Sequence, residues 1–163
     1  MITKEQYEFF SGLYEDAERT YGQLEARGNL YLGIIAGFLA TVLLKADGAV
    51  SSANSLGVPW WAVLVEALLF AGSLLFVLLA LRIRSYEAVN DPQKIVDGWK
   101  GDGPSNEEFY EDRIADYVVA ASRNAEINNQ KATMLSVAGW LLVVAMLQMI
   151  GIFAFALVRG TTQ

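Results

Sequence analysis

The sequence predicts an all-α integral membrane protein with three transmembrane helices, two of which extend into a cytoplasmic helical stalk. The chain has 163 residues, is 54% apolar and has a mean hydropathy of +0.32, an apolar share above that of ordinary soluble domains. The excess is gathered into three long runs. An amphipathic segment with helical spacing leads into the first run and another leads into the third. We therefore expect one membrane domain that covers residues 1–163.

The three apolar runs define the expected spans. The second is interrupted only by Glu66, and the third contains no charge, although Gln148 lies inside it. Both exceed the ~20 apolar residues that a span needs. The first uncharged run, Leu30–Leu44, is 15 residues long and needs its flanking residues to reach across. The predicted spans cover residues of about 29–46, 58–81 and 132–158.

The basic residues indicate the orientation. Of the 12 Lys and Arg residues, seven lie in 82–131 and three precede the first run. One lies in 45–57 and one follows the third run. Because segments on the cytoplasmic side are enriched in Lys and Arg, we expect the N-terminus and the stalk (3–28 and 82–131) in the cytoplasm. The 45–57 segment and the C-terminus are then outside. Because successive segments alternate between the two sides of the membrane, this arrangement requires three spans.

Both halves of the stalk begin with a capping signature and continue with helical spacing. Thr3 with Gln6, and Ser105 with Glu108, each match a capping box. Large side chains recur every three or four residues, which predicts packing seams. No breaker follows either seam, so each helix is expected to continue into its span. The seam residues are Tyr7, Phe10, Tyr14, Ala17, Tyr21, Leu24 and Gly28 in the first helix, and Tyr110, Ile114, Tyr117, Ala121, Asn124 and Asn128 in the second.

The connection between the second span and the second stalk helix must return to the far end of the stalk. Residues 82–90 are expected to prolong the second span as a helix until Asp91 and Pro92. A short helix is expected at 92–99, followed by a turn at 100–104, where Gly and Pro are frequent.

Small residues in the first span indicate close helix packing. Gly33 and Gly37 form a GxxxG pattern, and Thr41 follows four residues later. Such spacing lets helix backbones approach each other in lipid. The packing could lie within one chain or between chains, and we expect a homo-oligomer.

Glu66 is the main candidate for a functional residue. It shares one face of the second span with Ala62, Ser73 and Ala80, and a carboxylate at this depth is costly unless it is paired, hydrated or protonated. No apolar run contains Lys or Arg. Candidate partners are Ser73, Gln148 or Glu66 of neighbouring subunits. Three interpretations stay open: a protonated Glu66 that bonds another helix, a ring of Glu66 that lines a cation pore, and a proton-relay or transporter role.

A second polar group lies at the expected cytoplasmic membrane edge. Arg27 and Asn29 lie below the first span, and Asn124 and Asn128 lie below the third. They form either an interfacial belt or an intracellular girdle that gates the span region.

Several classes of function are excluded or disfavoured. The chain has no Cys and no His, which excludes Cys/His zinc sites, haem ligation by His and catalysis by either residue. Phosphate-binding loops, dinucleotide fingerprints and paired carboxylates are absent. We therefore expect no enzyme, no cofactor and no metal. A net charge of −6 without a basic patch disfavours nucleic acid as a partner.

Two stretches carry a resemblance to a known family. Residues 14–44 (YEDAERTYGQLEARGNLYLGIIAGFLATVLL) and 110–142 (YEDRIADYVVAASRNAEINNQKATMLSVAGWLL) each combine an acidic, Tyr-containing helix with a following span. In this they resemble SLATT-type domains, small bacterial two-span modules found beside nucleotide-second-messenger synthases in antiphage systems. The resemblance covers about half of the chain and carries no catalytic motif. The third span departs from the two-span pattern.

The resemblance implies the inner membrane of a bacterium and a role as an effector. Together with Glu66, it suggests an oligomeric pore-forming effector or small cation channel in antiphage defence. The alternative is a non-conducting scaffold or regulatory subunit that binds a cytoplasmic protein through its stalk. In either case the partners are the lipid bilayer and further copies of the chain.

Overall fold

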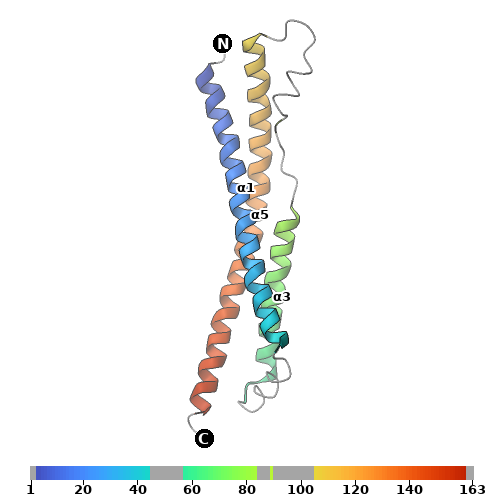
Figure 1. The fold of residues 1–163 in the computed structure, drawn as a ribbon, viewed down its shortest axis with the longest axis vertical. Helices are drawn as coiled ribbons and strands as arrows, with labels where there is room; N and C mark the ends of the chain where they lie inside the picture. Colours follow the sequence, from blue (N-terminus) through green and yellow to red (C-terminus); the bar gives the residue numbers. More distant parts are fainter. Residues whose placement is uncertain (1–2, 45–56, 84–88, 90–104, 161–163) are drawn as a thin grey trace. The chain divides into compact units, whose positions relative to one another are not determined.

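The computed structural model of the chain describes residues 3–44, 57–83, 89 and 105–160. Three helices make up nearly all of this part: α1 (Lys4–Leu44), α3 (Trp60–Arg82) and α5 (Asn106–Gly160) (Figure 1). No strand occurs among the described residues. The predicted all-helical class is confirmed, and so is the continuity of the first and third helices from stalk segment to apolar run.

Two helices are long and apolar enough to cross a membrane, judged by length and composition. They are Trp60–Arg82 and Glu107–Arg159, in which an 18-residue window has a mean hydropathy of 2.5 and 2.7, respectively. The first apolar run forms the C-terminal part of α1. The described part of the chain thus contains two candidate membrane-spanning helices.

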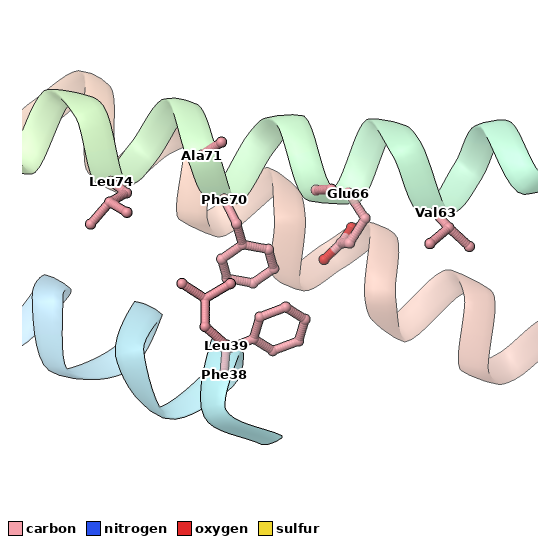
Figure 2. Close-up of a pocket in the computed structure, with 8 residues that line it drawn as sticks. Phe38, Leu39, Val63, Glu66, Phe70, Ala71 and Leu74 are labelled. Atoms are coloured by element: carbon pink, nitrogen blue, oxygen red, sulfur yellow. The ribbon is translucent and has the colours of Figure 1, made fainter. Parts of the chain in front are cut away.

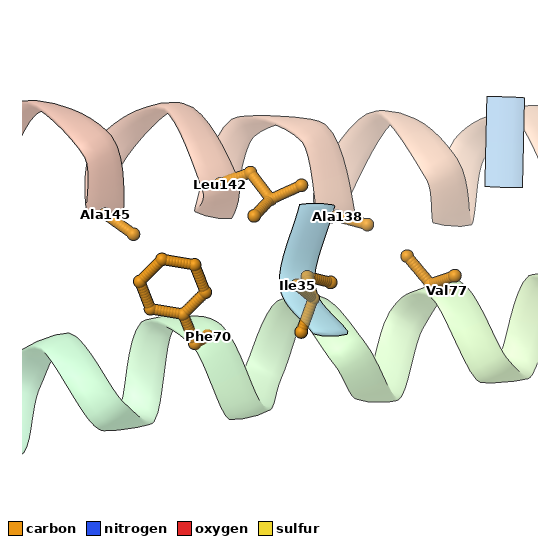
Figure 3. Packing of buried hydrophobic residues seen from close by; sticks show 6 residues of the cluster. All are labelled: Ile35, Phe70, Val77, Ala138, Leu142 and Ala145. Carbon is orange, nitrogen blue, oxygen red and sulfur yellow. The ribbon is translucent and has the colours of Figure 1, made fainter. Parts of the chain in front are cut away.

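The chain divides into two compact units, and α1 and α5 contribute to both. Unit 2 comprises Glu25–Arg82 and Ala132–Gln163. Its core draws one residue from α1, two from α3 and three from α5 (Figure 3), namely Ile35, Phe70, Val77, Ala138, Leu142 and Ala145. The α5 residues of this core are three or four positions apart, the spacing of one helix face. Unit 2 is therefore a three-helix arrangement with a continuous apolar centre.

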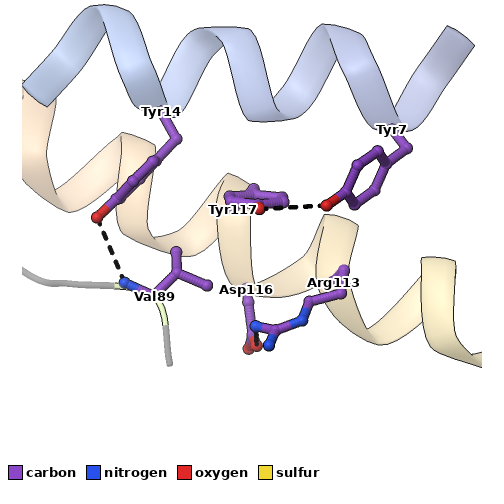
Figure 4. Close-up of polar contacts among 6 residues, drawn as sticks. All are labelled: Tyr7, Tyr14, Val89, Arg113, Asp116 and Tyr117. Atoms are coloured by element: carbon purple, nitrogen blue, oxygen red, sulfur yellow. Dashed lines mark hydrogen bonds and ion pairs between the residues drawn. The ribbon is translucent and has the colours of Figure 1, made fainter. Parts of the chain in front are cut away.

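Unit 1 comprises Met1–Leu24 and Ile83–Lys131, and tyrosine rings of α1 and α5 pack together in it (Figure 4). The Tyr7 ring lies 5.3 Å from that of Tyr110 and 5.7 Å from that of Tyr117, and the Tyr14 ring also lies 5.7 Å from that of Tyr117. The Tyr7 and Tyr117 hydroxyls are 3.4 Å apart. Residues with higher numbers in α1 contact residues with higher numbers in α5. The two helices therefore run parallel here and pack through the predicted seams.

The ends of the helices match the sequence signals at two places and differ at a third. Both capping boxes form. The backbone N–H of Gln6 donates to Thr3 Oγ1 at 3.3 Å, and the backbone N–H of Glu108 donates to Ser105 Oγ at 3.3 Å. The expected prolongation of the second span to residue 90 is wrong, because α3 ends at Arg82 and neither Ile83 nor Val89 is helical. The expected short helix at 92–99 and the turn at 100–104 lie outside the described residues.

The two capping boxes differ in charge, which predicts different responses to acid. Hydrogen bonds donated by the Ser105 backbone amide and hydroxyl hold the pKa of Glu108 below its usual value of 4.5. A lowered folded-state pKa adds stability above the unfolded-state value, and this stability is lost as the pH falls through the folded-state pKa. We expect amide protection in the first turn of α5 to fall below about pH 4.

The Thr3–Gln6 box is the internal control, because Gln6 does not titrate. Amide hydrogen exchange, corrected for the intrinsic effect of pH, measures the protection at both helix starts. On acidification, protection at the start of α5 should fall more than protection at the start of α1. The variant Glu108→Gln should remove the difference. Equal pH dependence at both helix starts would contradict the assignment.

Candidate functional site

Glu66 lies on the face of α3 that is buried in unit 2. The predicted alignment of Ala62, Glu66, Ser73 and Ala80 is confirmed, since all four belong to one buried face that also includes Phe70 and Val77. The Glu66 side chain is only 8% exposed. A carboxylate therefore lies on a helix face whose other buried side chains are small or apolar.

The two side chains expected as partners of Glu66 are engaged elsewhere. Ser73 donates its hydroxyl to the Ala138 carbonyl at 2.9 Å, and Gln148 donates its amide to the Ala62 carbonyl at 2.8 Å. Both bonds join α3 to α5 and hold the two helices in register. Neither carboxylate oxygen of Glu66 receives a hydrogen bond within the part of the chain that the structure describes.

A pocket of about 250 Å³ lies beside Glu66, between α1 and α3 (Figure 2). Apart from the carboxylate, all of its lining side chains are apolar. Phe38 and Phe70 form one wall as a stacked pair, with ring centroids 3.9 Å apart and ring planes within 9° of parallel. Figure 2 shows the Glu66 carboxylate pointing from α3 into the space beside these two rings. The lining residues are Phe38, Leu39, Val63, Glu66, Ala67, Phe70, Ala71 and Leu74.

The predicted packing glycines of the first span lie on an open face of α1. A Cβ built at Gly33 or Gly37 would meet nothing within 4 Å. Thr41 is exposed and donates its hydroxyl to the Gly37 carbonyl of its own helix at 2.9 Å. These three residues therefore make no close helix contact within the described chain, and packing between chains stays a prediction.

Two other glycines carry the close helix contacts in unit 2. A Cβ at Gly28 would lie 2.9 Å from Leu81 Cδ2, and a Cβ at Gly139 would lie 2.8 Å from the Tyr31 hydroxyl. Gly28 had been placed on the seam of the first helix, whereas Gly139 was not singled out. A lone glycine in an apolar run has no neighbour at GxxxG spacing to draw attention to it.

The predicted polar girdle divides into buried and exposed members. Asn124 is fully buried and Asn128 is 6% exposed, and the Asn128 amide donates to the Ala17 carbonyl at 2.9 Å. Arg27 and Asn29 are exposed. Asn128 thus joins α5 to α1 inside unit 1 and Asn124 is buried on the same helix, whereas the other two members are exposed.

Lys131 is the last residue of the polar cluster that the sequence places just below the third span, after Asn124 and Asn128. Its side chain is fully buried in unit 1. The ammonium lies 3.8 Å from the centre of the Tyr21 ring and donates to the Ile83 carbonyl at 3.5 Å. Tyr21 donates its hydroxyl to the same carbonyl at 3.3 Å. Ile83 directly follows the last residue of α3, so Lys131 and Tyr21 satisfy a carbonyl at the end of that helix.

Tyr7, Tyr14 and Tyr117 form a tyrosine cluster in unit 1, in which Tyr117 is neutral at ordinary pH. Burial raises the pKa of Tyr117 to about 12, and the hydrogen bond with Tyr7 adds to the shift. Arg113 lies four residues earlier on α5, is 4% exposed and pairs with Asp116 at 3.4 Å (Figure 4). The cluster is therefore a packed element of unit 1.

The described residues contain no group of three or more acidic, His or Cys side chains that could hold a metal ion. No protein-family model, curated protein or solved structure matches the chain. Within its described residues the chain belongs to a class of all-helical proteins with helices apolar enough to cross a membrane. Two such helices occur there, and one of them carries a buried carboxylate that receives no hydrogen bond from those residues.

Proposed function

We propose that the chain is the subunit of a homo-oligomeric membrane pore that conducts cations, with Glu66 on or beside the conducting path. The observation that carries the proposal is the state of Glu66. Its carboxylate is buried, receives no hydrogen bond from the described chain and borders an apolar pocket. Such a group is costly in a membrane and typically marks an ion path or a ligand site.

The exposure of the apolar helices supports a location in lipid. Only 28% of the apolar window in α3 and 12% of that in α5 is buried in the chain. Large apolar side chains such as Leu68, Leu147 and Phe153 are more than 60% exposed. A core helix of a soluble protein would cover most of this surface, whereas a bilayer or further subunits cover it here.

The proposed topology has three spans, at about residues 29–46, 58–81 and 132–158. The first apolar run packs with the other two through Ile35, which is fully buried in the unit 2 core. A helix that packs along two membrane helices would share their environment. The distribution of Lys and Arg then supports a cytoplasmic N-terminus and an external C-terminus.

The open face of α1 supports association between copies of the chain. Gly33 and Gly37 present a flat surface with no atom of the described chain close to it. In lipid, small residues at this spacing favour helix contacts. Further copies of the chain are the natural occupants, because a contact repeated around a rotation axis joins identical subunits into a closed ring. Several copies would bring several Glu66 carboxylates near one axis and attract cations.

Cation flux from proteoliposomes tests the proposal. The wild-type protein should raise K⁺ efflux above that of protein-free vesicles. Glu66→Gln should lower the flux by roughly tenfold or more, since it removes the negative charge and keeps the shape. Gly37→Leu should lower both flux and oligomer size, because it fills the flat face.

Ile34→Phe is the matched control for the Gly37 variant. Ile34 is exposed on the same helix, and its substitution adds bulk without filling the glycine face. Flux equal to that of protein-free vesicles, or unchanged flux in Glu66→Gln, would sink the proposal.

The resemblance of residues 14–44 and 110–142 to SLATT-type domains supports a setting for this activity. Within that setting, the protein is a pore-forming effector in the inner membrane of a bacterium, and it acts in antiphage defence. Expression of the wild-type chain should then dissipate the membrane potential of a bacterial host, and Glu66→Gln should do so less.

One observation favours the alternative function, a non-conducting scaffold. Phe9, Leu13, Val118 and Val119 are each at least 42% exposed on unit 1, which offers an apolar surface to a cytoplasmic protein. The stalk tyrosines Tyr14 and Tyr21, which could also have bound such a partner, make contacts inside unit 1. The Tyr14 ring packs on the Tyr117 ring, and Tyr21 contacts Lys131 and the Ile83 carbonyl. A partner would therefore be lost on Phe9→Ser rather than on substitution of Tyr14 or Tyr21.

A further inference from the structure

We propose that the pocket beside Glu66 binds a protonated primary amine with a short apolar tail, taken up from the surrounding membrane. The inference rests on the proposed location of unit 2 in lipid, but not on conduction. It names a ligand class for a site that the pore proposal treats only as a source of negative charge.

The Glu66 carboxylate lacks hydrogen-bond donors within the described chain. Both oxygens of Glu66 are buried without a donor in the described chain, and a carboxylate can accept several hydrogen bonds. A primary ammonium carries three N–H donors and a positive charge, so one ligand can bond both oxygens. Hydrogen bonds between two charged groups are about twice as strong as neutral ones.

The wall of the pocket suits an apolar tail, because every lining side chain except Glu66 is apolar. Phe38, Phe70 and Leu74 face the space next to the carboxylate (Figure 2), and its volume of about 250 Å³ suits a phenyl ring on a short alkyl chain. The aromatic walls also tolerate a nearby cation better than aliphatic walls would.

The exposure of the outer wall indicates how a ligand enters. Leu39 is 40% exposed and Val63 is 49% exposed, and Ala67 and Ala71 are exposed as well. These residues border the pocket on the surface of unit 2. The amine, in its neutral and hydrocarbon-soluble form, can therefore enter the pocket sideways. A turn of the Glu66 side chain then brings its buried oxygens to the ligand, and the carboxyl proton passes to the amine to form the ammonium–carboxylate pair.

The chemistry predicts an order of affinities. A primary amine should bind best, because it supplies both charge and donors. Its N-trimethyl counterpart keeps the charge but offers no N–H, and the matching alcohol offers one weak donor and no charge. The alcohol should bind roughly ten- to hundredfold more weakly than the amine, the range expected for loss of hydrogen bonds to a charged group.

Isothermal titration calorimetry on the full chain in nanodiscs tests the inference with phenylbutylamine, phenylbutyltrimethylammonium and phenylbutanol as probes. Empty nanodiscs of the same lipid correct for partitioning. Glu66→Gln should reduce the affinity for the amine to that for the alcohol. Ala71→Phe, which fills the pocket, should weaken all three probes, whereas Leu68→Phe on the exposed face of the same helix should change none.

The outcomes separate this inference from the pore proposal. Amine binding that survives Glu66→Gln, or equal affinities for amine and alcohol, would overturn the ligand site whatever the flux assay shows. Amine binding that is lost in Glu66→Gln, together with unchanged cation flux, would support the ligand site and sink the conducting role of Glu66.

Discussion

Replacement of Lys131 by alanine is expected to lower the free energy of unfolding by about 2–4 kcal/mol, the range for truncating a large buried side chain. The side chain is fully buried, and its ammonium lies 3.8 Å from the centre of the Tyr21 ring. A desolvated contact of this kind contributes about 2 kcal/mol. The variant also leaves a cavity and removes a donor from the Ile83 carbonyl, at the end of α3 where a positive charge is favourable.

Denaturant unfolding in detergent micelles, followed by circular dichroism, measures the loss. Lys131→Met keeps most of the apolar stem and should lose about half as much, which separates charge from volume. A double-mutant cycle with Tyr21→Leu should give a coupling of about 1–2 kcal/mol. Lys4→Ala is the control, because Lys4 makes only an exposed i,i+4 pair with Glu8, worth about 0.5 kcal/mol at most. A Lys131→Ala loss as small as that would contradict the role.

The faces of the helices could be predicted from the sequence because spacing alone decides them. The Ala62–Ala80 face of α3 is the face that the structure buries, and the seam of the first helix, from Tyr7 to Gly28, is half-buried at first and buried at Leu24 and Gly28. In both helices the inward residues recur every three or four positions. The capping boxes could also be predicted from the sequence, because each depends on two residues that are only three positions apart.

The polar contacts between helices could not be predicted in the same way. Gln148 and Ser73 were recognised as polar residues within apolar runs, yet their acceptors are the backbone carbonyls of Ala62 and Ala138. A carbonyl is present at every residue, so no sequence signal shows which one is within reach. The same holds for Lys131, whose contacts with Ile83 and Tyr21 depend on where α3 ends.

The end of α3 itself shows how tertiary contacts override helical propensity. Residues 83–90 contain no Gly or Pro, so the sequence predicted a helix as far as Asp91. In the structure, the Ile83 carbonyl is bonded by Lys131 and Tyr21, and the Val89 amide donates to the Tyr14 hydroxyl at 3.4 Å. Side chains of α1 and α5 thus satisfy backbone groups that a helix would otherwise satisfy within itself.

Replacement of Glu66 by leucine is expected to stabilise the protein by about 2–4 kcal/mol while it removes both proposed activities of the site. A carboxyl group without a partner costs several kcal/mol in an apolar environment, and the described chain offers Glu66 no donor. Leucine has a similar volume, and the neighbouring pocket leaves room for its different shape. A residue that reduces stability in this way is retained for function rather than for folding.

The free energy of unfolding in bicelles, measured by steric trapping, provides the test, with Ser73→Ala as the matched control on the same face of α3. That variant removes a 2.9 Å hydrogen bond to the Ala138 carbonyl and should destabilise by about 0.5–1.5 kcal/mol, opposite in sign to Glu66→Leu. Glu66→Gln should fall between wild type and Glu66→Leu, since it loses the charge but leaves an amide unpaired. If Glu66→Leu destabilises instead, Glu66 bonds a group in a neighbouring subunit. Its role is then to hold the oligomer together, and neither the conducting path nor the amine site requires it.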